Sequence, residues 1–151
     1  MTPVCVPFRL DAAARGDALR EFNARAEILW FGFRGRFEEP GLSVVTLERL
    51  EPGLLGGGGT AALNGGVISA GFDAAVVLAG LGQYAAPAVV TLELSVRFLS
   101  LARPAPGLAF RARVVRSSRR FAFVEAELSD AGDPAGSASA LASAMVAPAG
   151  A

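Results

Sequence analysis

Charge is almost absent from Pro52 to Leu92, where Asp73 is the single charged side chain in 41 residues. Within this stretch, the residues from about Gly65 to Gly82 are apolar on nearly every side of a helix, which is typical of a helix enclosed by other structure. Asn64 precedes them and is a candidate N-cap. The pattern therefore predicts one buried central helix over about 65–82, with a lone buried acid near its middle.

Alternation with a period of two marks the second half of the chain. Val90, Leu92, Leu94, Val96 and Phe98 alternate with polar residues, so we expect a half-buried strand there. Further strands are expected over 28–38, 42–50, 110–114, 121–128 and 136–147, with a frayed end from Pro148. An amphipathic helix is expected over about 12–26. This order indicates a single α+β domain over 1–151, with the apolar helix packed against an antiparallel sheet.

The composition excludes several classes of chemistry. The chain has no His, which removes His-dependent triads and His metal ligands, and its single Cys excludes a Cys-rich zinc site. We therefore expect no metal and no other cofactor. The formal net charge is zero, so charge gives no support for a nucleic-acid partner.

The uncharged stretch over 61–82 is long enough to cross a bilayer, but the composition argues against a membrane span. Asn64, Asp73 and five glycines would lie inside it. A helix buried in a soluble protein explains the same run. The N-terminus also lacks the pattern of a signal peptide, and together with the single Cys5 this favours a reduced, cytoplasmic setting.

The motif Asn64-Gly65-Gly66, with Asp73 nine residues after Asn64, resembles the His-Gly-Gly motif and following acid of hotdog-fold acyl-CoA thioesterases. The resemblance is to the branch related to phenylacetyl-CoA and 4-hydroxybenzoyl-CoA thioesterases, and it covers roughly 42–147. It continues through residues 90–99, 102–104 and 119–121. It implies a hotdog fold, in which an antiparallel sheet wraps around one long central helix.

The resemblance also implies roles for individual residues. The Gly65 N–H would polarise the thioester carbonyl, and Asp73 would act as the nucleophile or as the base for water. Donors at a helix N-terminus suit a developing oxyanion, and glycine allows a substrate to approach the backbone closely. Gly66 would contact the substrate, and Thr91 aligns with a hydroxyl that assists in some members. Asn64, in place of the His, donates hydrogen bonds but does not titrate.

Spacing adds a prediction about assembly. Gly65 and Asp73 are eight residues apart, which is about 12 Å along a helix, so one thioester cannot touch both in the same chain. The site should therefore be shared between two copies across a two-fold axis, in a homodimer or a dimer of dimers. Arg103, Arg119 and Arg120 are candidates for binding the phosphates of coenzyme A, or are simply solvated loop charges.

Three functions compete on this evidence. The first is an acyl-CoA thioesterase, and the second is a non-catalytic acyl-CoA binder. The second is motivated by Asn64 and by Gly58, which stands where the family often has a polar residue. The third, a hotdog dehydratase or hydratase, ranks last because those enzymes use a His. Simpler interpretations also stay open. Asp73 could be a structural acid, capped by a hydroxyl or paired with an Arg across a dimer, and Thr91 an ordinary strand residue. The aromatic cluster of Trp30, Phe31 and Phe33 is more typical of core or interface than of an acyl pocket.

Overall fold

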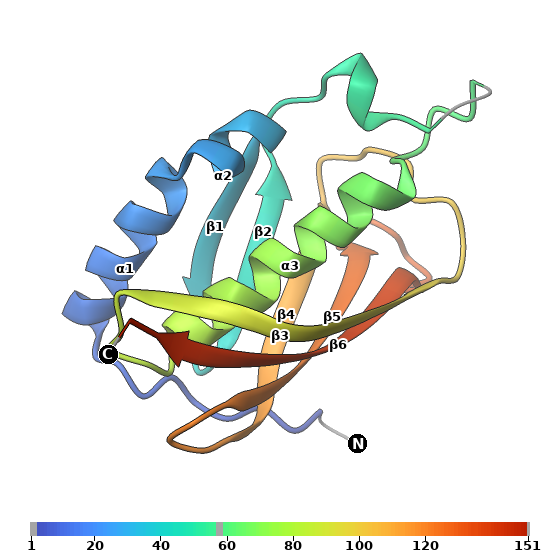
Figure 1. Cartoon of the computed structure of the whole chain (residues 1–151). Coiled ribbons are helices and arrows are strands. Elements are labelled where there is room, and N and C mark those ends of the chain that lie inside the picture. The colour runs from blue at the N-terminus through green and yellow to red at the C-terminus, as the bar shows by residue number, and fades with distance from the viewer. Residues whose placement is uncertain (1–2, 57–58, 151) are drawn as a thin grey trace.

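A curved antiparallel sheet wraps around helix α3 (Gly65–Leu81) in the computed structural model of this protein, which describes residues 3–56 and 59–150 (Figure 1). The described residues form six strands in the order β1-β2-β4-β5-β6-β3. Their bounds are β1 (Phe33–Glu38), β2 (Leu42–Leu47), β3 (Ala88–Phe98), β4 (Leu108–Ser117), β5 (Ala122–Asp130) and β6 (Ala138–Ala149). The predicted α+β architecture is confirmed, although β6 continues past the frayed end expected from Pro148.

Helix α3 begins where the sequence places it. The Asn64 side chain accepts a hydrogen bond of 2.8 Å from the Val67 N–H, which satisfies one of the free donors of the first turn. Most residues of α3 are buried, and this confirms the predicted central helix, which ends at Leu81. Gly71 is required for the packing, because a Cβ at this position would overlap the ring of Phe110. Among the described residues, no helix is long and apolar enough to cross a membrane.

Two short helices replace the single N-terminal helix expected over 12–26. They are α1 (Ala12–Ala24) and α2 (Ala26–Phe31), and Arg25 separates them with an extended backbone. The prediction of a strand from Ile28 was therefore wrong, because β1 begins only at Phe33. Ile28 and Phe31 are three residues apart, so a helix brings both to the same cavity, and this packing outweighs the strand preference of the aromatic run. Gly32, at φ 73°, ends α2 in the left-handed conformation.

The two edges of the sheet differ. At the β1 edge, the side-chain amide of Asn23 accepts a hydrogen bond of 2.7 Å from the Gly35 N–H and donates one of 3.0 Å to the Gly35 carbonyl. The Asn23 amide therefore pairs with the Gly35 N–H and carbonyl, which face away from β2. At the opposite edge, β3 pairs with β6 alone among the described strands. The outer side of β3 is left without strand partners.

A β-bulge lies in the middle of β3. The register with β6 shifts between Thr91 and Glu93, so that Thr91 lies opposite Val146 and Leu94 lies opposite Ala144. Opposed residues in an antiparallel pair share a face, and both β6 partners are buried. The bulge therefore places Thr91 on the same face as Leu94, whereas the strict alternation predicted from the sequence placed them on opposite faces.

Candidate active site

Asp73 lies near the middle of α3, and Thr91 lies on the neighbouring strand β3. The Thr91 hydroxyl donates a hydrogen bond of 2.6 Å to the Oδ1 of Asp73. A hydrogen bond to a charged acceptor at this length is a strong one, and it fixes the orientation of the carboxylate. The bulge in β3 makes this contact possible, because it turns Thr91 toward the helix.

Asp73 is exposed in the single chain, whereas the sequence predicted a buried acid. The reason is that the sheet and the N-terminal helices leave one stripe of α3 uncovered. This stripe runs along Gly66, Ser69, Ala70 and Asp73, which follow helical spacing and are all exposed or half-buried. The carboxylate therefore stands on the open side of an otherwise enclosed helix.

The N-terminus of α3 carries the second group of site residues. Gly65 and Gly66 are exposed, and among the described residues neither backbone N–H donates a hydrogen bond. Asn64 is engaged in local structure: its oxygen caps the Val67 N–H, and one N–H of its amide donates a hydrogen bond of 3.2 Å to the Gly53 carbonyl. Asn64 therefore supports the loop and the helix start, while the two glycine N–H groups are available for an anionic or carbonyl oxygen.

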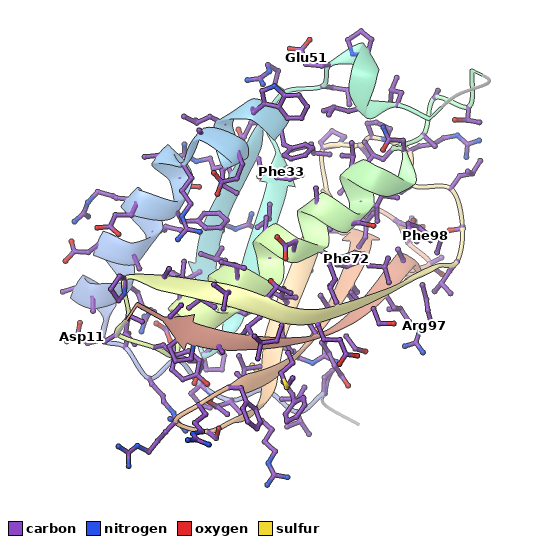
Figure 2. All side chains as sticks on the ribbon, viewed as in Figure 1. Asp11, Phe33, Glu51, Phe72, Arg97 and Phe98 are labelled. Carbon is purple, nitrogen blue, oxygen red and sulfur yellow. The ribbon has the colours of Figure 1, made fainter. Side chains whose placement is uncertain are left out.

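Phe98, at the end of β3, closes one side of this helix N-terminus. Its ring carbon lies 3.4 Å from the position that a Cβ on Gly65 would occupy, and the side chain is otherwise exposed (Figure 2). The ring therefore lies beside Gly65 on the side where a side chain would project. Sequence reasoning treated Phe98 only as a strand residue, because nothing in the alternation links residue 98 to the start of the helix.

An apolar cavity of about 270 Å³ opens beside Asp73, between α3 and the junction of α1 and α2. We call it the acyl cavity, after the role that we propose for it below. Asp73, Arg25 and Glu27 are its charged residues. Its apolar walls are Phe22, Ile28, Phe31, Phe33, Ala70, Ala74 and Val77.

Two of the three residues in the predicted aromatic cluster line this cavity. The rings of Phe31 and Phe33 stack with centroids 5.0 Å apart and an angle of 13° between their planes. Trp30 is mostly exposed and packs edge-on against Phe31. Phe33 belongs to the hydrophobic core and Phe31 packs against it, as that interpretation expects, and both rings also form one wall of the cavity.

The three candidate arginines separate into two groups. Arg103 is exposed and follows Ala102, whose carbonyl accepts a hydrogen bond of 2.9 Å from the Leu63 N–H, so it lies near the start of α3. Arg119 and Arg120 are exposed in the β4–β5 loop, which is held by the Tyr84 hydroxyl through a hydrogen bond of 2.9 Å to the Ser118 carbonyl. That loop lies at the other end of α3, about 25 Å away along a helix of this length.

Gly65 and Asp73 lie on one continuous helix, so the expected separation of about 12 Å applies within the chain. Gly58, the other departure from the family pattern, lies outside the described residues. Nowhere in the described parts of the chain do three or more acidic, Cys or His side chains gather as metal ligands would.

The family model of the Thioesterase superfamily matches residues 61–137, which are 77 of the 151 residues. The chain belongs to this superfamily. The match includes Asn64, Gly65, Asp73 and Thr91. No curated protein matches this thioesterase-superfamily chain by sequence.

Solved structures share the fold of this thioesterase-superfamily chain. A thioesterase family protein from Silicibacter pomeroyi is 25% identical, with a TM-score of 0.73 and coverage of 88% of this chain and 96% of that one. The PaaI protein of the E. coli phenylacetic acid degradation operon is 20% identical, with a TM-score of 0.73 and coverage of 91% and 94%. A thioesterase from Haemophilus influenzae is 14% identical, with a TM-score of 0.74 and coverage of 94% of each chain. These likenesses confirm the hotdog thioesterase fold.

Proposed function

We propose that this protein is an acyl-CoA thioesterase, which hydrolyses a thioester to the free acid and coenzyme A. The observation that carries the proposal is the Asp73 carboxylate, held by the Thr91 hydroxyl at 2.6 Å and bordering the acyl cavity. An oriented carboxylate beside an apolar cavity suits a reaction in which an apolar acyl group is bound and its carbonyl is attacked.

Asp73 acts in one of two ways. As a general base it takes a proton from water while the water oxygen bonds to the thioester carbon; the C–S bond then breaks and the sulfur receives the proton. As a nucleophile its oxygen bonds to the carbonyl carbon and displaces the coenzyme A thiolate, and water then hydrolyses the resulting anhydride. In both cases Thr91 holds Oδ1 and leaves Oδ2 free to react.

The Gly65 N–H stabilises the negative charge that develops on the carbonyl oxygen. Because this N–H lies about 12 Å along the helix from the Asp73 of the same chain, we infer that the partner's Gly65 serves each Asp73 in a homodimer. The free edge of β3 supports this assembly, because among the described strands β3 pairs only with β6, and a second copy can pair with its outer backbone groups.

Coenzyme A would lie outside the acyl cavity, with Gly66 and Arg103 near the Gly65 end of α3. A two-fold axis that brings the partner's Gly65 to Asp73 also reverses the direction of α3. Arg119 and Arg120 of one copy then lie toward the Arg103 end of the other, where arginine donors would suit phosphate groups. A dimer of dimers stays compatible with this arrangement.

One observation favours the alternative of a non-catalytic acyl-CoA binder. The Asn64 amide is tied into the chain at Val67 and Gly53, and unlike the motif His it cannot titrate, so it supplies no acid or base beside the substrate. A binder would keep the acyl cavity and the helix N-terminus but would show no turnover.

The test is thiol release from a panel of aryl and alkyl acyl-CoA thioesters, with wild type beside Asp73→Asn. Loss of a positioned acid or base costs about 10²- to 10⁴-fold, so we expect at least about a hundredfold fall in kcat. Asp133→Asn, on the loop between β5 and β6, is the matched control and should keep wild-type turnover. No turnover by wild type, with acyl-CoA binding retained, would replace the thioesterase with the binder.

A mixing experiment tests the shared site. Gly65→Pro removes the N–H from one subunit, and Asp73→Asn removes the carboxylate from the other. Each homodimer is then inactive, but a mixed dimer holds one intact site made from the two unmutated residues. Equal mixing makes about half of the dimers mixed, so about a quarter of wild-type activity should return. No recovery after subunit exchange would show that each site belongs to one chain.

A further inference from the structure

Helix α3 carries two polar side chains, Ser69 and Asp73, and both lie on the stripe that the sheet and the N-terminal helices leave uncovered. Asp73 is assigned to the reaction, which leaves Ser69 unexplained. Its hydroxyl donates a hydrogen bond of 2.9 Å to the Gly65 carbonyl. We propose that Ser69 is a positioning residue, which strengthens the Gly66 N–H as a second donor to the thioester oxygen. This inference rests on the proposed function, because it takes the start of α3 as the oxyanion site.

The Gly65 carbonyl and the Gly66 N–H belong to one peptide group. A trans peptide is planar, so the carbonyl points toward the C-terminal end of the helix while the N–H points toward its open start. A hydrogen bond accepted by the oxygen draws electrons away from the nitrogen and leaves the N–H more positive, which is the cooperativity of hydrogen-bond chains. The Ser69 hydroxyl therefore acts on a donor that it does not touch.

The Gly66 N–H is free to bind an oxygen atom of a ligand. Among the described residues it donates to no acceptor, and neither does the Gly65 N–H before it. The third N–H of α3, that of Val67, already donates to the Asn64 side chain at 2.8 Å. Two adjacent N–H groups therefore stay open at the start of the helix, where such groups point at the same ligand. An oxygen bound by the first of them lies within reach of the second.

Other uses of the Ser69 hydroxyl fit the structure less well. As a nucleophile it would need a base, but its proton is directed at the Gly65 carbonyl, and the described structure holds no hydrogen bond between Ser69 and Asp73. As a helix-stabilising residue it would be a poor choice. Serine has a lower helix propensity than alanine, and a hydroxyl bonded to the carbonyl four residues earlier slightly destabilises a helix. A role at the helix start explains a serine at this position.

The position of Ser69 also suits a shared site. It lies four residues from both Gly65 and Asp73, which is about 6 Å along the helix in each direction. A two-fold axis that brings Gly65 of one copy to Asp73 of the other therefore passes near Ser69. The hydroxyl and the peptide group that it polarises are then sheltered from water, where a hydrogen bond has a larger electrostatic effect.

The experiment measures thiol release from the acyl-CoA panel for Ser69→Ala, which removes the hydroxyl, and for Ser69→Thr, which keeps it. Threonine in a helix can bond to the same carbonyl. An oxyanion donor is worth about 10²- to 10³-fold in kcat, and a neighbouring hydrogen bond strengthens it by about 10–30%. These magnitudes predict that kcat falls about twofold to eightfold in Ser69→Ala. KM should change little, because the oxyanion forms only after the substrate has bound.

Stability separates this role from a structural one. Ser69→Ala should melt at or above the temperature of wild type, because alanine is the better helix former. Ser69→Thr should keep a kcat close to that of wild type. Ser137→Ala, in the connection between β5 and β6, is the matched control and should change neither quantity. A wild-type kcat in Ser69→Ala, or an equal loss in Ser69→Thr, overturns the inference while leaving the thioesterase in place.

Nuclear magnetic resonance tests the inference without turnover. The probe is the ketone analogue of phenylacetyl-CoA, in which a methylene group between the carbonyl and the sulfur prevents hydrolysis. Its carbonyl oxygen should shift the amide proton resonances of Gly65 and Gly66 downfield in wild type, and the Gly66 shift should be smaller in Ser69→Ala. The Gly65 N–H is the internal control, because Ser69 does not bond to the carbonyl of its peptide group. A Gly66 resonance that the analogue does not move in wild type overturns the inference, whether or not wild type hydrolyses thioesters.

Discussion

Replacement of Gly65 by proline removes one N–H from the candidate oxyanion site and changes little else. Gly65 is the first residue of α3, where a helix tolerates proline because the N–H has no partner within the helix. The residue before a proline must be extended, and Asn64 already has φ −72° and ψ 155°. The proline ring therefore fits the existing backbone while the donor is lost.

The expected cost follows from the role of the donor. Loss of one oxyanion donor lowers kcat about 10²- to 10³-fold, or about 2.7–4 kcal/mol of transition-state stabilisation. Gly65→Ala is the matched control because it keeps the N–H, and its Cβ would lie 3.4 Å from the Phe98 ring, an ordinary van der Waals contact. We expect Gly65→Ala to retain most of the wild-type kcat.

Thiol release under saturating thioester measures kcat for the three proteins, and thermal unfolding shows whether each is folded. The informative result is a Gly65→Pro protein with a wild-type melting temperature. If that protein turns over as fast as Gly65→Ala, the Gly65 N–H is not the oxyanion donor, and the reasoning from the helix N-terminus is wrong. A loss in both variants would instead point to the space beside Phe98.

Three further substitutions test other parts of the structure. Thr91→Val keeps the side-chain shape but removes the hydroxyl that holds Asp73. We expect kcat to fall about tenfold to a hundredfold, with little change in melting temperature. An unchanged kcat would make the Thr91–Asp73 contact structural only. Gly71→Ala drives a methyl group into the Phe110 ring and should lower the free energy of unfolding, measured in urea, by about 1–3 kcal/mol; no loss would mean that the ring moves aside. Asn64→Ala removes the cap of α3 and should lower the free energy of unfolding, measured in urea, by about 0.5–2 kcal/mol. A fall in kcat larger than this loss of stability explains would restore a catalytic role for the Asn64 amide.

The central helix and the order of the strands could be predicted because strong local patterns specify them. Asn64 and the glycines after it mark the start of α3, and the apolar run marks its burial. Ile28 to Phe31 could not be assigned in this way. These residues favour strands by composition, and only the cavity and core that receive Ile28 and Phe31 select the helix.

The sequence points to some residues of the candidate site but not to their arrangement. The motif identifies Gly65 and Asp73, whereas the contact between Asp73 and Thr91 depends on a bulge that simple alternation does not reveal. Arg25 carries no sequence signal of its own, because it is one of 14 arginines. Its place in the lining of the acyl cavity follows only from the two helices that meet at this residue.

The side chain of Asn23 has a consequence for how copies of this protein can associate. By occupying the peptide group of Gly35, it blocks the middle of the β1 edge against strand addition. The described sheet then has a single edge, β3, on which another strand can be added. If two copies join there, as proposed above, the edge is consumed in both, so strand addition would stop at two copies and would not continue into a fibre. One asparagine would thus protect one edge of a protein rich in β-structure from open-ended strand addition.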